Sequence, residues 1–175
     1  MKKILCIALC LIMLFAFAAC GGNGEKPTDE TAGIFSSFTS ETLDAEKADE
    51  SIFKGKKVTM VNIWATFCGP CINEMPDLQR LHEDYADKGF QVVGIVCDIY
   101  GEDDIKTAKD IVKDTGVKYV SLLPSDTLNE AKLNSVTSVP ETLFVDETGA
   151  LIAGPYIGSR SYEDWKGIIE NILSK

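Results

Sequence analysis

The stretch WATFCGPC, residues 64–71, decides how this chain folds. It places Cys68 and Cys71 two residues apart, directly after the apolar run VTMVNIWA (58–65) and before residues with helical spacing. The run is short and rich in residues that suit a strand buried on both faces. A cysteine pair at the junction of such a strand and a helix can bind a metal ion, close a small loop or exchange electrons with another disulfide.

The apolar pattern around this junction predicts alternating strands and helices. Residues 71–88 have helical spacing up to Gly89, and an amphipathic helix is expected to stop at Gly116. The predicted elements begin with a weak hairpin with its turn at 43–47, a strand at 58–65, the helix at 71–88 and a strand at 90–96. They continue with a helix at 103–115, a strand at 118–123, a short helix at 126–133, a hairpin of 142–146 and 151–158, and a last helix capped by Ser161. Strands this apolar cannot face water, so the fold class is α/β, with helices covering a central sheet.

The N-terminus has the order of a secretory signal: Lys2 and Lys3, an apolar run over 4–19, and then Cys20. The run falls short of the roughly 20 residues that cross a bilayer. The small residues before Cys20 resemble a bacterial lipoprotein signal, although Phe17 stands where leucine is usual. We expect a signal peptide at 1–19, a lipidated Cys20 with a flexible tether over 20–34, and one domain at 35–175.

Two other fates of the leader remain open. The segment AFA (16–18) also suits ordinary signal peptidase, which would release a soluble secreted protein, and an uncleaved anchor is the third alternative. Each of these places the domain outside the cytoplasm. The chain has 17 basic and 27 acidic residues and a net charge of −10 at pH 7, which argues against binding nucleic acid or anionic lipid directly. Membrane association is therefore expected through the lipid anchor.

The cysteine count favours a redox role over a metal site or a structural staple. Structural zinc commonly needs a second cysteine pair or two histidines. His82 is the only histidine, and it lies about 16 Å from Cys71 along the same predicted helix. We therefore predict no metal and no cofactor, and we interpret His82 as a solvated side chain. A disulfide that closes a loop of two residues removes little chain entropy, so it would stabilise the fold poorly.

The position of the pair predicts different roles for its two members. Cys68 falls where free backbone N–H groups and the helix dipole favour an anion, so its thiol pKa should be lowered. Gly69 permits the turn, and Pro70 suits the first helical turn because no N–H donor is needed there. Cys71 lies one turn further in, less exposed, where it can resolve a mixed disulfide.

Two segments resemble a known family. WATFCGPCINEMPDL (64–78) resembles the active-site segment of the TlpA-like or ResA-like proteins, which are extracytoplasmic, membrane-tethered thiol–disulfide oxidoreductases. SVPETLFVDETG (138–149) resembles the second signature of that family. The resemblance covers about 35–175 and implies a thioredoxin-like fold, with the family's N-terminal hairpin and an inserted helix–strand unit at 98–118.

The resemblance also implies a set of site residues. Cys68 would attack and Cys71 would resolve, so that the reversible Cys68–Cys71 disulfide is the redox centre. Pro140 would be cis and face the pair, rather than an ordinary trans proline in a loop. The predicted contacts with substrate are Trp64, Phe67, which replaces the more common tryptophan, Gly69, Pro70, and the backbone of Val139 before Pro140.

Three further residues have alternative interpretations. Glu74 matches a glutamate that these proteins carry one turn past the second cysteine; it is either a solvated surface acid or the group that accepts the proton of Cys71. Thioredoxins have a buried aspartate at the position of Asn62, which cannot titrate, so Glu74 is the better candidate. Glu141 either contacts substrates or lies at the rim. Cys97 is either a buried, inert thiol or a third redox group.

Two other functions of thioredoxin-like folds lack the residues that they require. A peroxidase would need proline and threonine at the positions of Val61 and Ala65, and a copper carrier would need a histidine after His82. The alternatives that remain are a disulfide reductase, which the Gly-Pro pair favours, an oxidase or isomerase with the same cysteines, and a surface lipoprotein that only binds a partner. For a reductase, a membrane-embedded thiol donor is expected upstream. The expected client is apocytochrome c before haem attachment, a methionine sulfoxide reductase in antioxidant defence or another misoxidised protein, served by a monomer.

Overall fold

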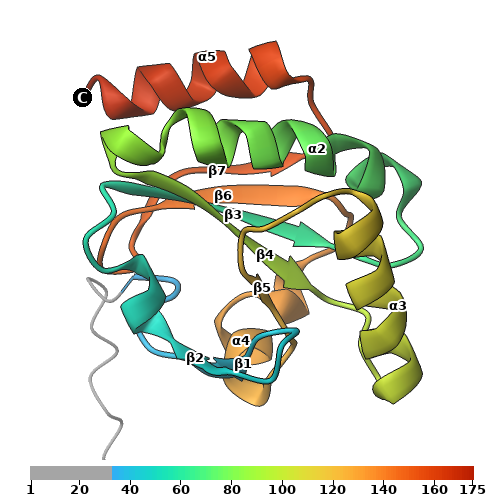
Figure 1. Cartoon of the computed structure of the whole chain (residues 1–175). Helices are drawn as coiled ribbons and strands as arrows, with labels where there is room; N and C mark the ends of the chain where they lie inside the picture. Colours follow the sequence, from blue (N-terminus) through green and yellow to red (C-terminus); the bar gives the residue numbers. More distant parts are fainter. Residues whose placement is uncertain (1–32) are drawn as a thin grey trace, which may run out of the picture. The chain divides into compact units, whose positions relative to one another are not determined.

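The computed structural model describes residues 33–175, so the predicted leader, the lipidation of Cys20 and the tether up to residue 32 lie outside the described residues. A central sheet has the strand order β5-β4-β3-β6-β7 (Figure 1). Its strands are β3 (Val58–Trp64), β4 (Phe90–Val96), β5 (Ser121–Leu122), β6 (Glu141–Val145) and β7 (Leu151–Ile157). The first three are parallel, and β6 and β7 run antiparallel to their neighbours. This is the mixed sheet of a thioredoxin-like fold, as predicted.

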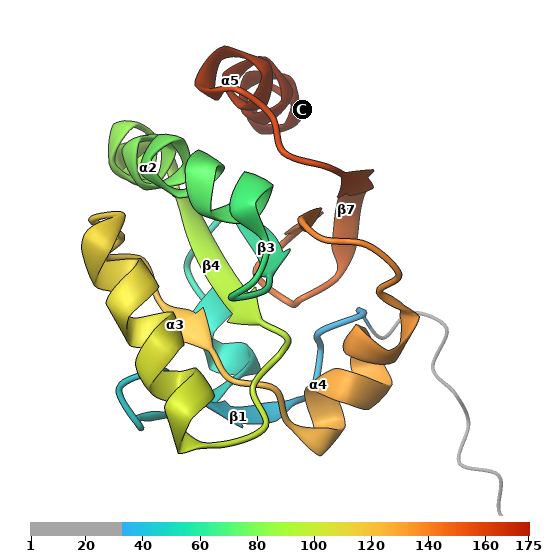
Figure 2. The same cartoon turned by 90° about the vertical axis from the view of Figure 1, so that its right-hand side faces the viewer.

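Helices and a hairpin cover the two faces of this sheet. Figures 1 and 2 both show α2 (Gly69–Asp84) and α5 (Tyr162–Leu173) side by side on one face. The hairpin of β1 (Thr39–Glu41) and β2 (Lys47–Asp49) lies on the other face with α4, while α3 lies near the β4–β5 edge. The remaining elements are η1 (Glu50–Phe53), η2 (Ala86–Lys88), α3 (Glu102–Asp114), α4 (Asp126–Ala131) and η3 (Leu133–Ser135). None of the helices within 33–175 is long and apolar enough to span a bilayer.

The alternation of side chains along β3 divides the core into two layers. Met60 and Trp64 point to the α2 side, where they pack with Met75, Leu78 and Trp165. Val61 and Ile63 point to the other side, where they pack in a cluster that contains Phe35, Phe38, Phe53, Leu128, Leu143 and Val145. All seven residues of β3 are buried, as expected for a central strand covered on both faces.

Most predicted elements are confirmed, and the differences concern their ends. β4 has the predicted bounds, and both predicted hairpins form. The strand expected at 118–123 shrinks to two residues because the N–H groups of Lys118 and Tyr119 donate to the side chain of Gln79 instead of a neighbouring strand. The helix expected over 71–88 begins earlier, at Gly69, and its last turn becomes η2 before Gly89, whose φ is +80°. The helix expected at 126–133 likewise divides into α4 and η3.

Candidate active site

Cys68 and Cys71 form a disulfide at the N-terminus of α2. Cys68 is the N-cap residue, and its Sγ accepts a hydrogen bond of 3.2 Å from the backbone N–H of Cys71. Pro70 lies in the first turn, where the helix needs no donor. Cys68 is 6% exposed and Cys71 is fully buried, so the predicted asymmetry between the two cysteines is confirmed. Only Cys68 can be reached by a disulfide of another protein.

The loop before Cys68 is fastened to the end of the neighbouring strand. The carboxylate of Asp98 accepts from the backbone N–H of Thr66 at 2.9 Å and from its hydroxyl at 2.6 Å. The N–H of Cys97 donates to the carbonyl of Trp64 at 2.9 Å, which extends the β3–β4 pairing by one bond. These contacts fix the path of the chain from the sheet into the redox pair, although the sequence analysis assigned no role to Asp98.

The Val139–Pro140 peptide is cis, as predicted, and it lies at the same end of the sheet as the disulfide. Glu141, the residue after it, pairs with Ile63 near the end of β3 that leads to Cys68. The carbonyl of Pro140 accepts from the N–H of Gly158 at 2.9 Å. The start of β6 is thus held from both sides, by β3 and by the end of β7. That the Val139 backbone receives substrate stays a prediction.

Glu74 is only 3% exposed, so the alternative of a solvated surface acid is wrong. Its Oε1 accepts from the side-chain amide of Asn62 at 3.1 Å, and its Oε2 accepts from the backbone N–H of Arg160 at 3.1 Å and the indole N–H of Trp165 at 3.3 Å. Burial raises the pKa of Glu74 above its ordinary value, and these three hydrogen bonds oppose the rise. A carboxyl group with a raised pKa, on the helix that carries both cysteines, is suited to exchange a proton with a thiol.

The three donors to Glu74 come from β3, from the residue two positions before α5 and from α5 itself. Asn62 lies in β3 and also donates to the hydroxyl of Thr142 in β6, at 3.1 Å. Arg160 precedes α5 and Trp165 lies in it, and both were missed as site residues. The sequence placed Trp165 correctly in the buried stripe of the last helix, but a stripe does not show which core residue turns a polar atom toward a carboxylate.

Two of the predicted substrate contacts differ sharply in exposure. Phe67 is 79% exposed, and Gly69 and Pro70 are exposed beside it, so these three residues can meet another protein. Trp64 is fully buried, so the prediction that it contacts substrate is wrong. Trp64 points inward because alternate residues of β3 face α2. Its indole ring packs closely against β4: a Cβ atom added at Gly94 would come within 3.3 Å of the indole nitrogen.

The expectations for Glu141 and His82 are also wrong. Glu141 neither contacts substrate nor lies at the rim: it is 3% exposed and forms an ion pair with Lys132 on the sheet face opposite α2. His82 is half-buried rather than solvated, and its Nδ1 accepts from the N–H of Val92 at 3.0 Å. Burial lowers the pKa of His82, so it is neutral at pH 7.

Cys97 is a free, half-buried thiol. Burial, and then the charge of Asp98, raise the pKa of Cys97, which keeps the thiol protonated and slow as a nucleophile. Among residues 33–175 no three side chains of His, Cys, Asp or Glu lie close enough together to hold a metal ion. The only groups of the described chain arranged for redox chemistry are therefore Cys68 and Cys71.

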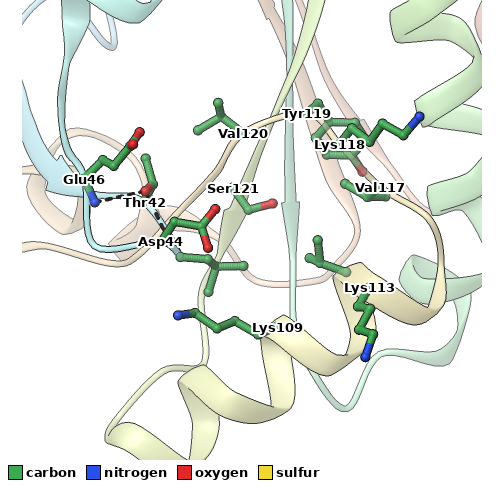
Figure 3. Close-up of a pocket in the computed structure, with 12 residues that line it drawn as sticks. Thr42, Asp44, Glu46, Lys109, Lys113, Val117, Lys118, Tyr119, Val120 and Ser121 are labelled. Atoms are coloured by element: carbon green, nitrogen blue, oxygen red, sulfur yellow. Dashed lines mark hydrogen bonds between the residues drawn. The ribbon is translucent and has the colours of Figure 1, made fainter.

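A separate cavity lies away from this site, between α3 and the turn of the β1–β2 hairpin (Figure 3). Its volume is about 350 Å³, and its wall includes Lys109 and Lys113 of α3, Asp44 of the turn and Ser121 of β5. Neither redox cysteine lines it, nor does Glu74 or Pro140. We therefore do not include it in the active site.

Comparison with known proteins agrees with the fold and with the cysteine pair. The family model described as Redoxin matches residues 30–154, so the chain belongs to the redoxin family. Within that class it is similar to the thioredoxin-like protein YneN of Bacillus subtilis, with 35% identity over 65% of this chain and 64% of YneN. It is also similar to the thiol-disulfide oxidoreductase ResA of Bacillus cereus, with 28% identity over 77% of this chain and 74% of ResA.

A solved structure agrees as well. The thiol:disulfide interchange protein of the thioredoxin family from Chlorobium tepidum has a TM-score of 0.67 and 28% identity, covering 78% of this chain and 93% of that one. The chain spans 64% of the length of YneN and 55% to 74% of the ResA proteins with which it shares 27% to 32% identity. The comparisons thus show a redoxin-family chain that is similar to ResA proteins and to a solved structure of the thioredoxin family.

Proposed function

We propose that this chain is an extracytoplasmic thiol–disulfide oxidoreductase that reduces disulfides in client proteins. The observation that carries the proposal is the disulfide between the N-cap residue Cys68 and the buried Cys71, with the buried Glu74 one turn further along the same helix. An attacking group, a resolving group and a proton acceptor are thereby aligned on one element.

The reaction begins with both cysteines reduced and Cys68 as the thiolate, which the helix N-terminus stabilises. Its sulfur attacks one sulfur of the client disulfide, forms a mixed disulfide and expels the other client sulfur as a thiolate. Cys71 then gives its proton to the carboxylate of Glu74, and the resulting thiolate attacks Cys68. The Cys68–Cys71 disulfide forms as the second client sulfur leaves. Two electrons pass to the client, and its two thiolates take up protons, one returned by Glu74 and one from water.

Several features favour reduction over oxidation. The Gly69–Pro70 pair resembles that of reducing thioredoxins, and a strong oxidant would need a much more stabilised thiolate than a site beside a buried carboxyl group provides. The negative charge of Glu74, when it is ionised, works against the extreme thiolate stabilisation that a strong oxidant needs. Thioredoxin-fold proteins that act as oxidases have reduction potentials of about −120 mV. A measured potential near that value would identify this chain as an oxidase instead.

The location and partners belong to the same proposal. The basic and apolar leader ending at Cys20 supports export and lipid anchoring. Since an exported reductase has no cytosolic reductant, its electrons come from a membrane-embedded thiol donor. The client is an extracytoplasmic protein with a disulfide; apocytochrome c and methionine sulfoxide reductase are the classes to test first.

Trapping the client tests the proposal directly. In the Cys71→Ser variant, Cys68 can still attack a client disulfide, but no second thiol is present to release the client. The variant should therefore accumulate a mixed disulfide with its client, which mass spectrometry of non-reduced samples would identify. Cys68→Ser should abolish reduction of insulin and form no such adduct, while Cys97→Ser serves as the matched control and should retain the activity. If Cys68→Ser still reduces insulin, Cys68 is not the attacking group; if it keeps its biological effect without that activity, the chain acts by binding a partner. Either result contradicts the proposal.

A further inference from the structure

Lys132 and Glu141 form a buried ion pair directly beside Pro140. Their side chains are 9% and 4% exposed, and the Nζ of Lys132 contacts the Oε1 of Glu141. Lysine and glutamate are almost never buried to this extent unless they are paired, because removing either charge from water is costly. A buried pair contributes little net stability, so its presence next to the redox site calls for another explanation.

The pair connects the sheet to the turn on the far side of the Pro140 loop. Glu141 is the first residue of β6 and is aligned with Ile63 of β3 and Ile157 of β7, so its backbone position is fixed by both neighbouring strands. Lys132 precedes η3 and also donates to the hydroxyl of Ser135 at 3.1 Å, while that hydroxyl donates to the Lys132 carbonyl at 2.7 Å. The ammonium group thus contacts the last residue of η3 as well as the first residue of β6.

The chain between these two anchors, residues 136–140, carries the Val139–Pro140 segment. Val136 and Val139 are only partly buried; Val136 packs against the core layer on the α4 side, and Val139 packs against both layers. Leu133, Asn134 and Val136 line a cavity of about 400 Å³ together with Cys97 and Ile99. The ion pair thus adds a charged link to the strand pairing at Glu141 and to the apolar contacts of Val136 and Val139.

We propose that Lys132 and Glu141 are positioning residues that hold the Val139–Pro140 backbone in register with Cys68 for a docking client. The inference rests on the proposed function, because it assigns that backbone to the client. A buried ion pair holds the two groups that it joins close together at one place, whereas apolar contacts are not directional. Replacing the pair by apolar residues of similar size can keep the fold. The Val139–Pro140 backbone should then no longer be held at a fixed position relative to Cys68.

The experiment uses the double variant Lys132→Met/Glu141→Leu, because either single change leaves a buried charge unpaired and endangers the fold. The matched control is Lys106→Met/Asp110→Leu, which removes an exposed pair of 3.3 Å on α3. Each reduced protein is assayed with insulin, whose chains must dock, and with 5,5′-dithiobis(2-nitrobenzoate), a small disulfide that needs no docked backbone. Hydrogen exchange of 136–140 is followed in parallel by mass spectrometry.

We expect the double variant to raise the KM for insulin about tenfold with kcat nearly unchanged, to keep its rate with the small disulfide within about twofold, and to speed exchange in 136–140 alone. The control should resemble the wild type in all three. A folded double variant with a normal KM for insulin, or with normal exchange in 136–140, overturns the inference. If the wild type reduces neither disulfide, the proposed function fails instead, and the exchange measurement still decides whether the pair fixes the segment.

Discussion

Two buried glutamates flank the start of β6, and they differ in what surrounds them. Glu74 lies on the α2 face and is bonded to neutral donors: the amide of Asn62, the indole of Trp165 and the backbone N–H of Arg160. Glu141 lies on the opposite face and is bonded to the ammonium group of Lys132. The two side chains are equally buried, at 3% exposure each.

The difference separates a buried carboxyl group held by neutral donors from one held by an opposite charge. Neutral donors stabilise a carboxylate without compensating its charge, so burial still raises the pKa of Glu74 and the group can take up a proton. A lysine compensates the charge of Glu141, and either group would become an unpaired buried charge if the other were removed. The proposed proton transfer thus lies on the α2 face of the sheet, and the proposed positioning of the backbone lies on the α4 face.

Lys132→Met gives the largest expected effect on this comparison, because it turns Glu141 into a buried carboxylate without a partner. We expect a loss of about 3–5 kcal/mol in the free energy of unfolding at pH 7, measured with urea. Lys118→Met is the control: its lysine is 79% exposed and 3.8 Å from Glu83, and its removal should cost less than about 1 kcal/mol. Equal losses in the two variants would mean that the buried pair is no more important than a surface pair.

The sequence predicted the redox pair better than the two carboxylates. Cys68 and Cys71 can be predicted from local signals, namely a strand end and a helix start within a few residues of each other. The cis Pro140 and the role of Glu74 follow from the family resemblance instead, and the burial of Glu74 depends on Trp165, which lies 91 residues away. The partner of Glu141 was missed because Lys132 lies in a polar segment that reads as surface, and Trp64 was misassigned because a motif does not show which way a strand residue points.

Glu74→Gln gives a smaller effect, on the order of 1 kcal/mol, and tests whether Glu74 titrates. The pKa of Glu74 is raised in the folded state, so the stability that this group contributes is complete below its ordinary pKa of 4.5 and is lost as the pH rises through the folded value. In the oxidised protein, the free energy of unfolding of the wild type minus that of Glu74→Gln should therefore decrease as the pH is raised above 4.5.

The control for this titration is Glu130→Gln, which changes an exposed glutamate of α4 in the same way. Its difference from the wild type is measured over the same window and subtracted, so that only the pH dependence specific to Glu74 remains. A corrected difference that stays constant would show that Glu74 does not change its charge there.

Arg160→Ala should have the smallest effect, although Arg160 is the cation nearest to the Glu74 network. The contact to Glu74 comes from the backbone N–H of Arg160, which alanine keeps, whereas its guanidinium group donates to the carbonyl of Gly158 at 2.8 Å and stacks 4.9 Å from the Trp165 ring. We expect the free energy of unfolding to fall by less than about 1 kcal/mol, which is the scale of a half-exposed cation–π contact. The pKa of Glu74, measured by NMR of its carboxyl group, should rise only slightly further. A loss as large as that of Lys132→Met would mean that Glu74 depends on a countercharge in the same way as Glu141. The small effect expected here is therefore the strictest test that neutral donors alone hold Glu74 in place.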